Sequence, residues 1–163
     1  MRRRGFKGFT LVELIVVIAV IGVLAGILVP TMMGYVKKAK IANANSAAKS
    51  LYNATMSALR EADVSRPVPD GIFADSEAES NYPSTYDGDT LRDAVYRYAK
   101  DLRGTRWAIL VEEDCVSSTM YMKTASENFL GTFPTQMKDS ISGTTGASSD
   151  VSDALNYAKN GTW

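Results

Sequence analysis

The fold is decided by residues 8–36, which read GFTLVELIVVIAVIGVLAGILVPTMMGYV. Glu13 is the one charged residue in this stretch, and residues 14–36 form a run of 23 uncharged residues. As a helix with a rise of about 1.5 Å per residue, this run would reach about 34 Å, enough to cross a hydrocarbon core of about 30 Å. The sequence therefore predicts a membrane-spanning helix near the N-terminus.

The residues before this stretch are basic: Arg2, Arg3, Arg4 and Lys7 precede it without any acidic residue. A cleaved secretory signal peptide has such a basic start, but here the apolar core is long and no Ala-x-Ala site follows it. A plain membrane anchor explains the hydrophobicity and leaves Glu13 unexplained, because an acid in a span needs a partner. A third interpretation uses the whole string from Gly8 to Glu13.

The string Gly8-Phe9-Thr10-Leu11-Val12-Glu13 resembles the N-terminus of type IV pilins and pseudopilins. That family has a short basic leader, a Gly, and then Phe-Thr-Leu-x-Glu running into an uninterrupted apolar helix. Here the resemblance covers about residues 1–40. It implies that a prepilin peptidase cleaves between Gly8 and Phe9 and methylates the new amine of Phe9. It also places Thr10 and Glu13 among the residues used in assembly.

Glu13 has a specific expected role. Cleavage would create a positive amine on Phe9, and we hypothesise that Glu13 accepts a hydrogen bond from the Phe9 amine of a neighbouring subunit. An unpaired carboxylate in apolar surroundings is costly, so this pairing would favour one axial register. The alternative is that Glu13 lies at the lipid headgroups or pairs within its own chain.

Small residues and a proline recur every four residues in the apolar run, at Gly22, Gly26, Pro30 and Gly34. This spacing keeps them near one helix face, where glycines allow close helix packing. Pro30 removes one backbone hydrogen bond. These residues could form a segment that stretches or bends when subunits pack, or they could reflect the ordinary tolerance of membrane helices for Gly and Pro.

An amphipathic pattern follows the apolar run. Apolar residues step by threes and fours through residues 37–65, at Ile41, Ala44, Ala48, Leu51, Tyr52, Thr55, Leu59 and Ala62, with Lys and Asn between them. We therefore expect one helix over about residues 10–62. The expected divisions are a leader (1–8), a membrane or filament-core helix (9–36), an amphipathic half (37–65) and a globular head (66–163). The fold class is α+β: the long helix packs on a small antiparallel sheet.

Shorter elements are expected in the head. Residues 70–90 are rich in Asp, Ser, Tyr and Gly and predict a loop. Asp89-Thr90 could cap a short helix with one apolar face, formed by Leu91, Ala94, Val95, Tyr98 and Leu102. Strands are expected at residues 107–111, 119–122 and 129–133. A second loop is expected at 142–149, and a short helix within 151–163.

The composition offers little for catalysis. The 18 basic and 18 acidic residues cancel, there is no His, and Cys115 is the one cysteine. We therefore expect no catalytic residues, no metal and no cofactor, since the usual general base and nucleophile pairs are missing. We expect Cys115 to be half-buried at a strand end. Neutral charge gives no indication of nucleic-acid binding.

The resemblance implies a structural subunit of a type IV pilus. Its partners would be the prepilin peptidase, other pilin subunits, an assembly platform protein and, through it, an assembly ATPase. The precursor would span the cytoplasmic membrane once before joining an extracellular filament. One alternative is a pseudopilin of a type II secretion or DNA-uptake system, although the scattered acids do not suggest the calcium loop that some secretion pseudopilins carry. A less favoured alternative is a membrane-anchored adhesive ectodomain.

Overall fold

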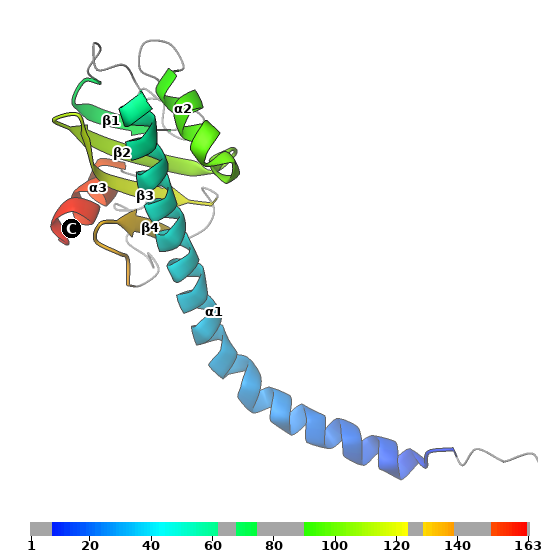
Figure 1. Ribbon diagram of the computed structural model, residues 1–163. Coiled ribbons are helices and arrows are strands. Elements are labelled where there is room, and N and C mark those ends of the chain that lie inside the picture. Colours follow the sequence, from blue (N-terminus) through cyan, green and yellow to red (C-terminus); the bar gives the residue numbers. More distant parts are fainter. Residues whose placement is uncertain (1–7, 62–67, 75–89, 124–128, 139–150, 163) are drawn as a thin grey trace, which may run out of the picture. The chain divides into compact units, whose positions relative to one another are not determined.

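The computed structural model describes residues 8–61, 68–74, 90–123, 129–138 and 151–162 (Figure 1). The elements follow in the order α1 (Leu11–Glu61), β1 (Gly71–Ala74), α2 (Thr90–Tyr98), a 3-10 turn η1 (Lys100–Leu102), β2 (Arg106–Glu112), β3 (Cys115–Met122), β4 (Leu130–Phe133) and α3 (Val151–Asn160). This arrangement confirms the predicted α+β class. The expected leader residues 1–7, the cap at Asp89 and the loop at 142–149 lie outside the described residues.

The chain forms two units, Met1–Lys37 and Lys38–Trp163, and each is described by itself. The first unit contains the N-terminal part of α1. The second contains the rest of α1 and all other elements. The helix begins and ends within a residue of the predicted limits, because no Gly or Pro interrupts its polar half and its apolar half satisfies its backbone internally.

The second unit is built on a four-stranded antiparallel sheet in the order β1-β2-β3-β4. The three expected strands are confirmed, and the expectation of a loop throughout residues 70–90 is wrong at its start. Residues Gly71–Ala74 form β1 at the sheet edge, with Phe73 opposite Ile109 of β2. Four residues are too few to show the alternation of apolar and polar side chains that marks a strand. They form a strand because pairing with β2 supplies their backbone hydrogen bonds.

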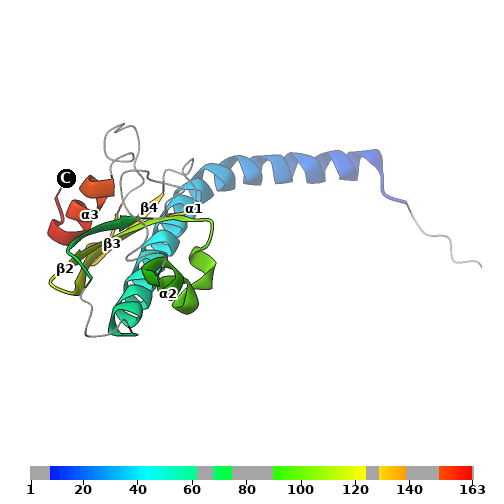
Figure 2. The ribbon, with the colours of Figure 1, turned by 90° about the horizontal axis from the view of Figure 1, so that it is seen from above.

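Helices cover both faces of this sheet. Trp107, Ile109 and Val111 of β2 join a buried cluster with α2 and the polar half of α1. The intervening Ala108, with Met120 and neighbours, joins a second cluster with α3. Figure 2 shows α1 and α2 on one side of the strands and α3 on the other. The short C-terminal helix was expected, but its place behind the sheet was not.

The amphipathic stripe of α1 faces the sheet largely as predicted. Among the expected positions, the buried ones are Ile41, Ala44, Ala48, Leu51 and Thr55, while Tyr52 and Leu59 are half-buried. Ala62 lies outside the described residues. The assignment of every Asn to the polar face is wrong for Asn45, which is 5% exposed. Its side chain is buried because backbone groups of β4 and of the segment after it bind it there.

Two residues of the head, Cys115 and Tyr98, are more exposed than expected. Cys115 begins β3 as expected, but it is exposed rather than half-buried. Tyr98 does not share the buried face of α2: it is 52% exposed, and its hydroxyl donates to Glu61 Oε2 at 3.2 Å. This hydrogen bond to a carboxylate raises the pKa of Tyr98 above its ordinary value. Tyr98 was assigned to the apolar face from helical periodicity, which does not show that α2 ends at this residue.

Candidate functional site

The expected cleavage position lies just before α1. Gly8 and Phe9 are exposed and outside regular structure, and the Phe9 side chain is 89% exposed. A Cβ added to Gly8 would meet no atom within 4 Å, so the structure itself does not require a glycine here. An exposed, non-helical peptide bond is what a peptidase needs, since a protease must draw the backbone into its own site.

Thr10 and Glu13 form a reciprocal cap at the start of α1. The Thr10 backbone N–H donates to Glu13 Oε2 at 2.8 Å, and the Thr10 hydroxyl donates to the same oxygen at 2.6 Å. In return, the Glu13 N–H donates to Thr10 Oγ1 at 3.3 Å. This is a capping box, which satisfies N–H groups that have no partner within a helix. This box was not predicted from the sequence, although Thr-x-x-Glu ahead of an apolar run is its signature.

The cap leaves part of Glu13 available. Both hydrogen bonds to its carboxylate end on Oε2, and Oε1 accepts none from the described residues. A carboxylate can accept about four hydrogen bonds, so an amine could bind Oε1 while the capping box persists. The structure thus places Glu13 against Thr10 of its own chain, with Oε1 accepting no hydrogen bond from the described residues.

The apolar half of α1 has no cover within the first unit. Large side chains from Leu11 to Val36 are all at least half exposed, and none of the most apolar window is buried. One helix in the described part of the chain is long and apolar enough to cross a membrane. So much exposed apolar surface in one stretch marks a membrane or protein contact.

Gly22, Gly26, Pro30 and Gly34 all lie on this exposed part of α1. A Cβ at any of the three glycines would meet nothing within 4 Å, so no contact inside the chain requires their small size. The helix continues through Pro30. The next residue, Thr31, donates its hydroxyl to the carbonyl of Leu28 at 2.8 Å. Any packing role for these residues must therefore involve another molecule.

Two further residues were not identified from the sequence, and both join α1 to the sheet. Gly131 of β4 lies so close to α1 that an added Cβ would be 2.0 Å from the carbonyl carbon of Ala44. Asn45 binds three backbone groups on β4 and the segment that follows. No local pattern marks either residue, because each acts on a partner far along the chain.

The described residues contain no cluster of three or more His, Cys, Asp or Glu side chains that could hold a metal ion. Acidic side chains take part in ion pairs instead, such as Glu61 with Arg97 at 3.2 Å and Glu112 with Lys159 at 2.7 Å. Hydrogen bonds from Lys159 and from Ser117 lower the pKa of Glu112 below its usual range. These groups have structural partners and form no reactive constellation.

Comparisons with known proteins match parts of the chain. A family model described as the prokaryotic N-terminal methylation motif matches residues 3–29. The type IV narrow pilus major component PilA5 of Thermus thermophilus is 38% identical over 80 residues, which cover 49% of this chain and 68% of that protein. No solved structure matches the chain.

Two other relatives share shorter stretches. The type IV major pilin protein PilA of Myxococcus xanthus is 40% identical over 57 residues, covering 35% of this chain and 26% of that protein. The type II secretion system core protein G of Klebsiella michiganensis is 51% identical over 39 residues, covering 24% of this chain and 28% of that protein. The match to the Myxococcus protein thus spans about a quarter of that relative's length.

Proposed function

Because the chain belongs to the type IV pilin family, we propose that it is a structural subunit of a type IV pilus. The observation that carries the proposal is the uncovered apolar half of α1, with the Thr10–Glu13 cap at its start. Such a surface must be covered by lipid or by other copies of the same helix. In a subunit that passes from membrane to filament, this surface would be covered first by lipid and then by neighbouring helices.

The proposed sequence of events begins in the cytoplasmic membrane, which the precursor would span once through residues 9–36. Prepilin peptidase would cleave between Gly8 and Phe9 and methylate Phe9. An assembly platform protein, driven by an assembly ATPase, would then move the subunit into a filament whose core is a bundle of these helices. We propose no catalytic role for the chain.

Specificity in this transfer cannot come from hydrophobicity alone. Lipid tails and neighbouring helices cover apolar surface equally well, so close packing and polar pairing must select the filament. Gly22, Gly26 and Gly34 would allow close approach, since no contact within their own chain uses their small size. Glu13 would accept a hydrogen bond from the Phe9 amine of a neighbour on the oxygen that the cap leaves available.

The first experiment measures the N-terminal mass and sequence of the protein recovered from its native host. A chain that begins at Phe9 with a methylated amine supports the proposal. A chain that begins at Met1 would indicate an anchor that is not processed. A chain that begins well past Pro30 would indicate a cleaved signal peptide and would overturn the proposal.

A second experiment distinguishes two roles of Glu13: setting the register between subunits and capping the start of α1. We expect Glu13→Leu to be processed normally and to form few or no filaments, because the Phe9 amine then has no acceptor. Thr10→Val is the matched control, since it removes the hydroxyl from the capping box and keeps the carboxylate. Filament yield is measured by shearing and electron microscopy. If both variants lose filaments equally, Glu13 acts as a helix cap and the register role is wrong.

The second candidate function is a pseudopilin of a type II secretion or DNA-uptake system. It is supported by the 51% identity to a type II secretion system core protein over 39 residues. Deletion of the gene distinguishes the two. Loss of long surface fibres supports a pilus, whereas retained fibres with loss of secretion or of DNA uptake support a pseudopilin. Retained fibres with loss of adhesion alone would instead favour an anchored adhesive ectodomain.

A further inference from the structure

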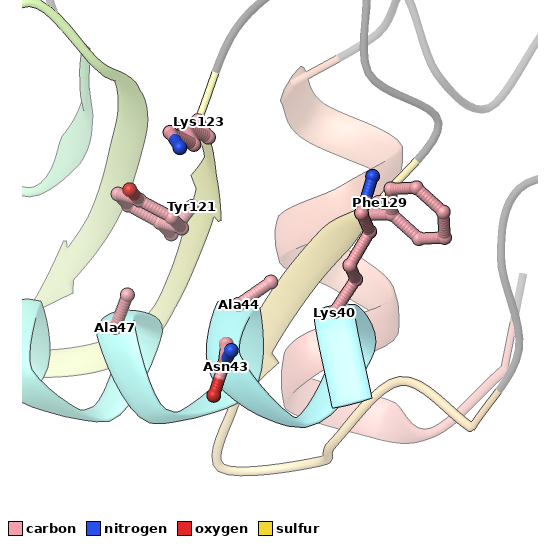
Figure 3. Close-up of a pocket in the computed structure, with 7 residues that line it drawn as sticks. All are labelled: Lys40, Asn43, Ala44, Ala47, Tyr121, Lys123 and Phe129. Atoms are coloured by element: carbon pink, nitrogen blue, oxygen red, sulfur yellow. The ribbon is translucent and has the colours of Figure 1, made fainter. Parts of the chain in front are cut away.

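A hollow of about 330 Å³ lies between α1 and the end of β3 in the second unit. It is lined by Lys40, Asn43, Ala44, Ala47, Tyr121, Lys123 and Phe129. Figure 3 shows Ala44 at the floor, with Tyr121 and Lys123 on one side and Lys40 with Phe129 on the other. The hollow thus has an apolar floor and carries one lysine on each of two walls.

Among the residues that the structure describes, the charged side chains that line this hollow are all of one sign: two lysines and no carboxylate. Neither Lys40 nor Lys123 has a carboxylate partner among the described residues, where the ion pairs formed by α2 and α3 use Arg97 and Lys159. Two ammonium groups at one hollow repel each other, and an anion between them would turn this repulsion into attraction.

The side chains present suit a phosphate group. Each ammonium has three hydrogen-bond donors and no acceptor, and lysine binds phosphate as a compact point charge. The Lys40 ammonium lies 4.9 Å from the centroid of the Phe129 ring, and this cation–π contact holds it at the edge of the hollow. The Asn43 side chain adds an amide donor to the lining.

The position of Lys40 along the chain suggests one source of the phosphate group. Lys40 follows Val36, the last residue of the uncharged run, by four positions. Four residues of chain span at most about 14 Å, so Lys40 stays near the level of the lipid headgroups while residues 9–36 cross a bilayer. Basic residues next to a membrane span bind anionic lipids.

We propose that the hollow formed by Lys40, Lys123 and the apolar floor binds a phosphate group. The source of the phosphate is a phospholipid headgroup or free phosphate in solution. The binding chemistry is the same for both sources, and it does not require a filament. The lipid source alone rests on the membrane-anchored precursor of the proposed function.

The test follows backbone amide resonances of Ala47 and Tyr121 in the isotopically labelled full chain, held in dodecyl maltoside without phosphate buffer. Inorganic phosphate, dihexanoyl phosphatidylglycerol and acetate are titrated separately. We expect saturable shifts at both residues with phosphate or with the lipid, and much weaker shifts with acetate. Saturation by the lipid alone identifies the headgroup, and saturation by phosphate alone identifies the free ion.

The variant Lys40→Gln with Lys123→Gln should weaken this binding at least about tenfold, because it removes both charge-assisted donors. The matched control is Lys38→Gln with Lys138→Gln. These lysines line a second hollow of about 340 Å³ that also contains Asn45 and Met137. The control removes the same charge from one residue of α1 and one of the head, and it should leave the shifts unchanged. Unperturbed resonances elsewhere check that both double variants fold.

Three outcomes would overturn the proposal. The first is the absence of saturable shifts with either phosphate source. The second is an equal loss in both double variants, which would mean that general basic charge attracts the anion. The third is equal binding of acetate, which would indicate a carboxylate of a neighbouring protein as the ligand. None of these bears on whether Phe9 is processed, so the proposed function is tested separately.

Discussion

At the scale of single residues, Gly131 and Asn45 decide how α1 meets the sheet. Gly131 allows the backbone of β4 to approach the backbone of α1 directly, since any side chain would meet the carbonyl of Ala44. One turn of α1 is thereby held against the strand. The Asn45 amide then satisfies the backbone groups that this close packing removes from water.

Gly131→Ala should strongly destabilise the head. The added methyl would lie 2.0 Å from the carbonyl carbon and oxygen of Ala44, and backbone atoms on both sides must move to accommodate it. We expect a loss of about 3 kcal/mol or more in the free energy of unfolding, at the upper end of overpacking effects. Urea denaturation of the full chain in neutral detergent measures it. Gly34→Ala is the control and should cost nothing, as its Cβ meets no atom.

Asn45→Ala should cost about 2–5 kcal/mol. Asn45 Nδ2 donates to the Met137 carbonyl at 2.8 Å, and its Oδ1 accepts from the N–H groups of Thr132 and Met137 at 3.1 and 3.2 Å. The substitution leaves these buried backbone groups without partners, at about 1–3 kcal/mol for each group that water does not reach. Asn43→Ala, an exposed change on the same helix, should stay within about 0.5 kcal/mol. Equal effects in urea denaturation would contradict the role of Asn45.

At the scale of elements, the β2–β3 hairpin closes with an unusual turn. Glu112 lies opposite Cys115, so the loop consists of Glu113 and Asp114. Both residues have positive φ, 51° and 58°, which is the type I′ geometry that Asn-Gly prefers. The Glu113 N–H donates to Asp70 Oδ1 at 2.8 Å and so joins the turn to the segment before β1. A left-handed backbone brings the Cβ of each residue close to the following carbonyl oxygen, and this steric cost lowers the stability of the turn.

Asp114→Gly should stabilise the head by about 0.5–1 kcal/mol. Glycine removes the steric cost of the left-handed conformation, and this gain exceeds its extra entropy in the unfolded chain. Thermal unfolding followed by circular dichroism measures the change. Asp114→Ala removes the same charge without relieving the backbone, so it should be neutral or destabilising. A stabilising Asp114→Ala would show that charge, rather than backbone geometry, limits the turn.

At the scale of the whole molecule, the two units differ in how their apolar residues are shielded from water. Both buried clusters of the head lie within the second unit, between Ile41 and Leu155. In the first unit, the large apolar side chains from Phe9 to Val36 are exposed. The second unit can therefore fold without help, whereas the first unit depends on lipid or on other subunits.

A chain that begins at Lys38 should therefore be soluble, monomeric and folded. Sedimentation velocity and circular dichroism without detergent check this, with cooperative unfolding as evidence of a packed core. The full chain should aggregate under the same conditions, because the large apolar side chains between Phe9 and Val36 remain exposed. A shortened chain that aggregates or melts without cooperativity would mean that the first unit contributes to the stability of the head.

What the sequence determined by itself is the local part of this protein. The apolar run, the amphipathic stripe and the motif from Gly8 to Glu13 are read from neighbours along the chain, and they predicted the long helix and the family. Three strands followed from short β-prone runs. The capping box at Thr10 could also have been predicted, since Thr-x-x-Glu is a local signal, but it was recognised only in the structure.

Only the tertiary structure decided the rest. β1 is a strand because β2 lies beside it, and the buried amide of Asn45 binds a backbone group 87 residues away. Gly131 is required by the backbone of α1, and Lys40 and Lys123 line a hollow that neither segment forms alone. Helical and strand periodicity arise from contacts within a few residues, so a pattern can report them. Contacts between distant segments depend on how those segments pack, and this information appears only once the chain has folded.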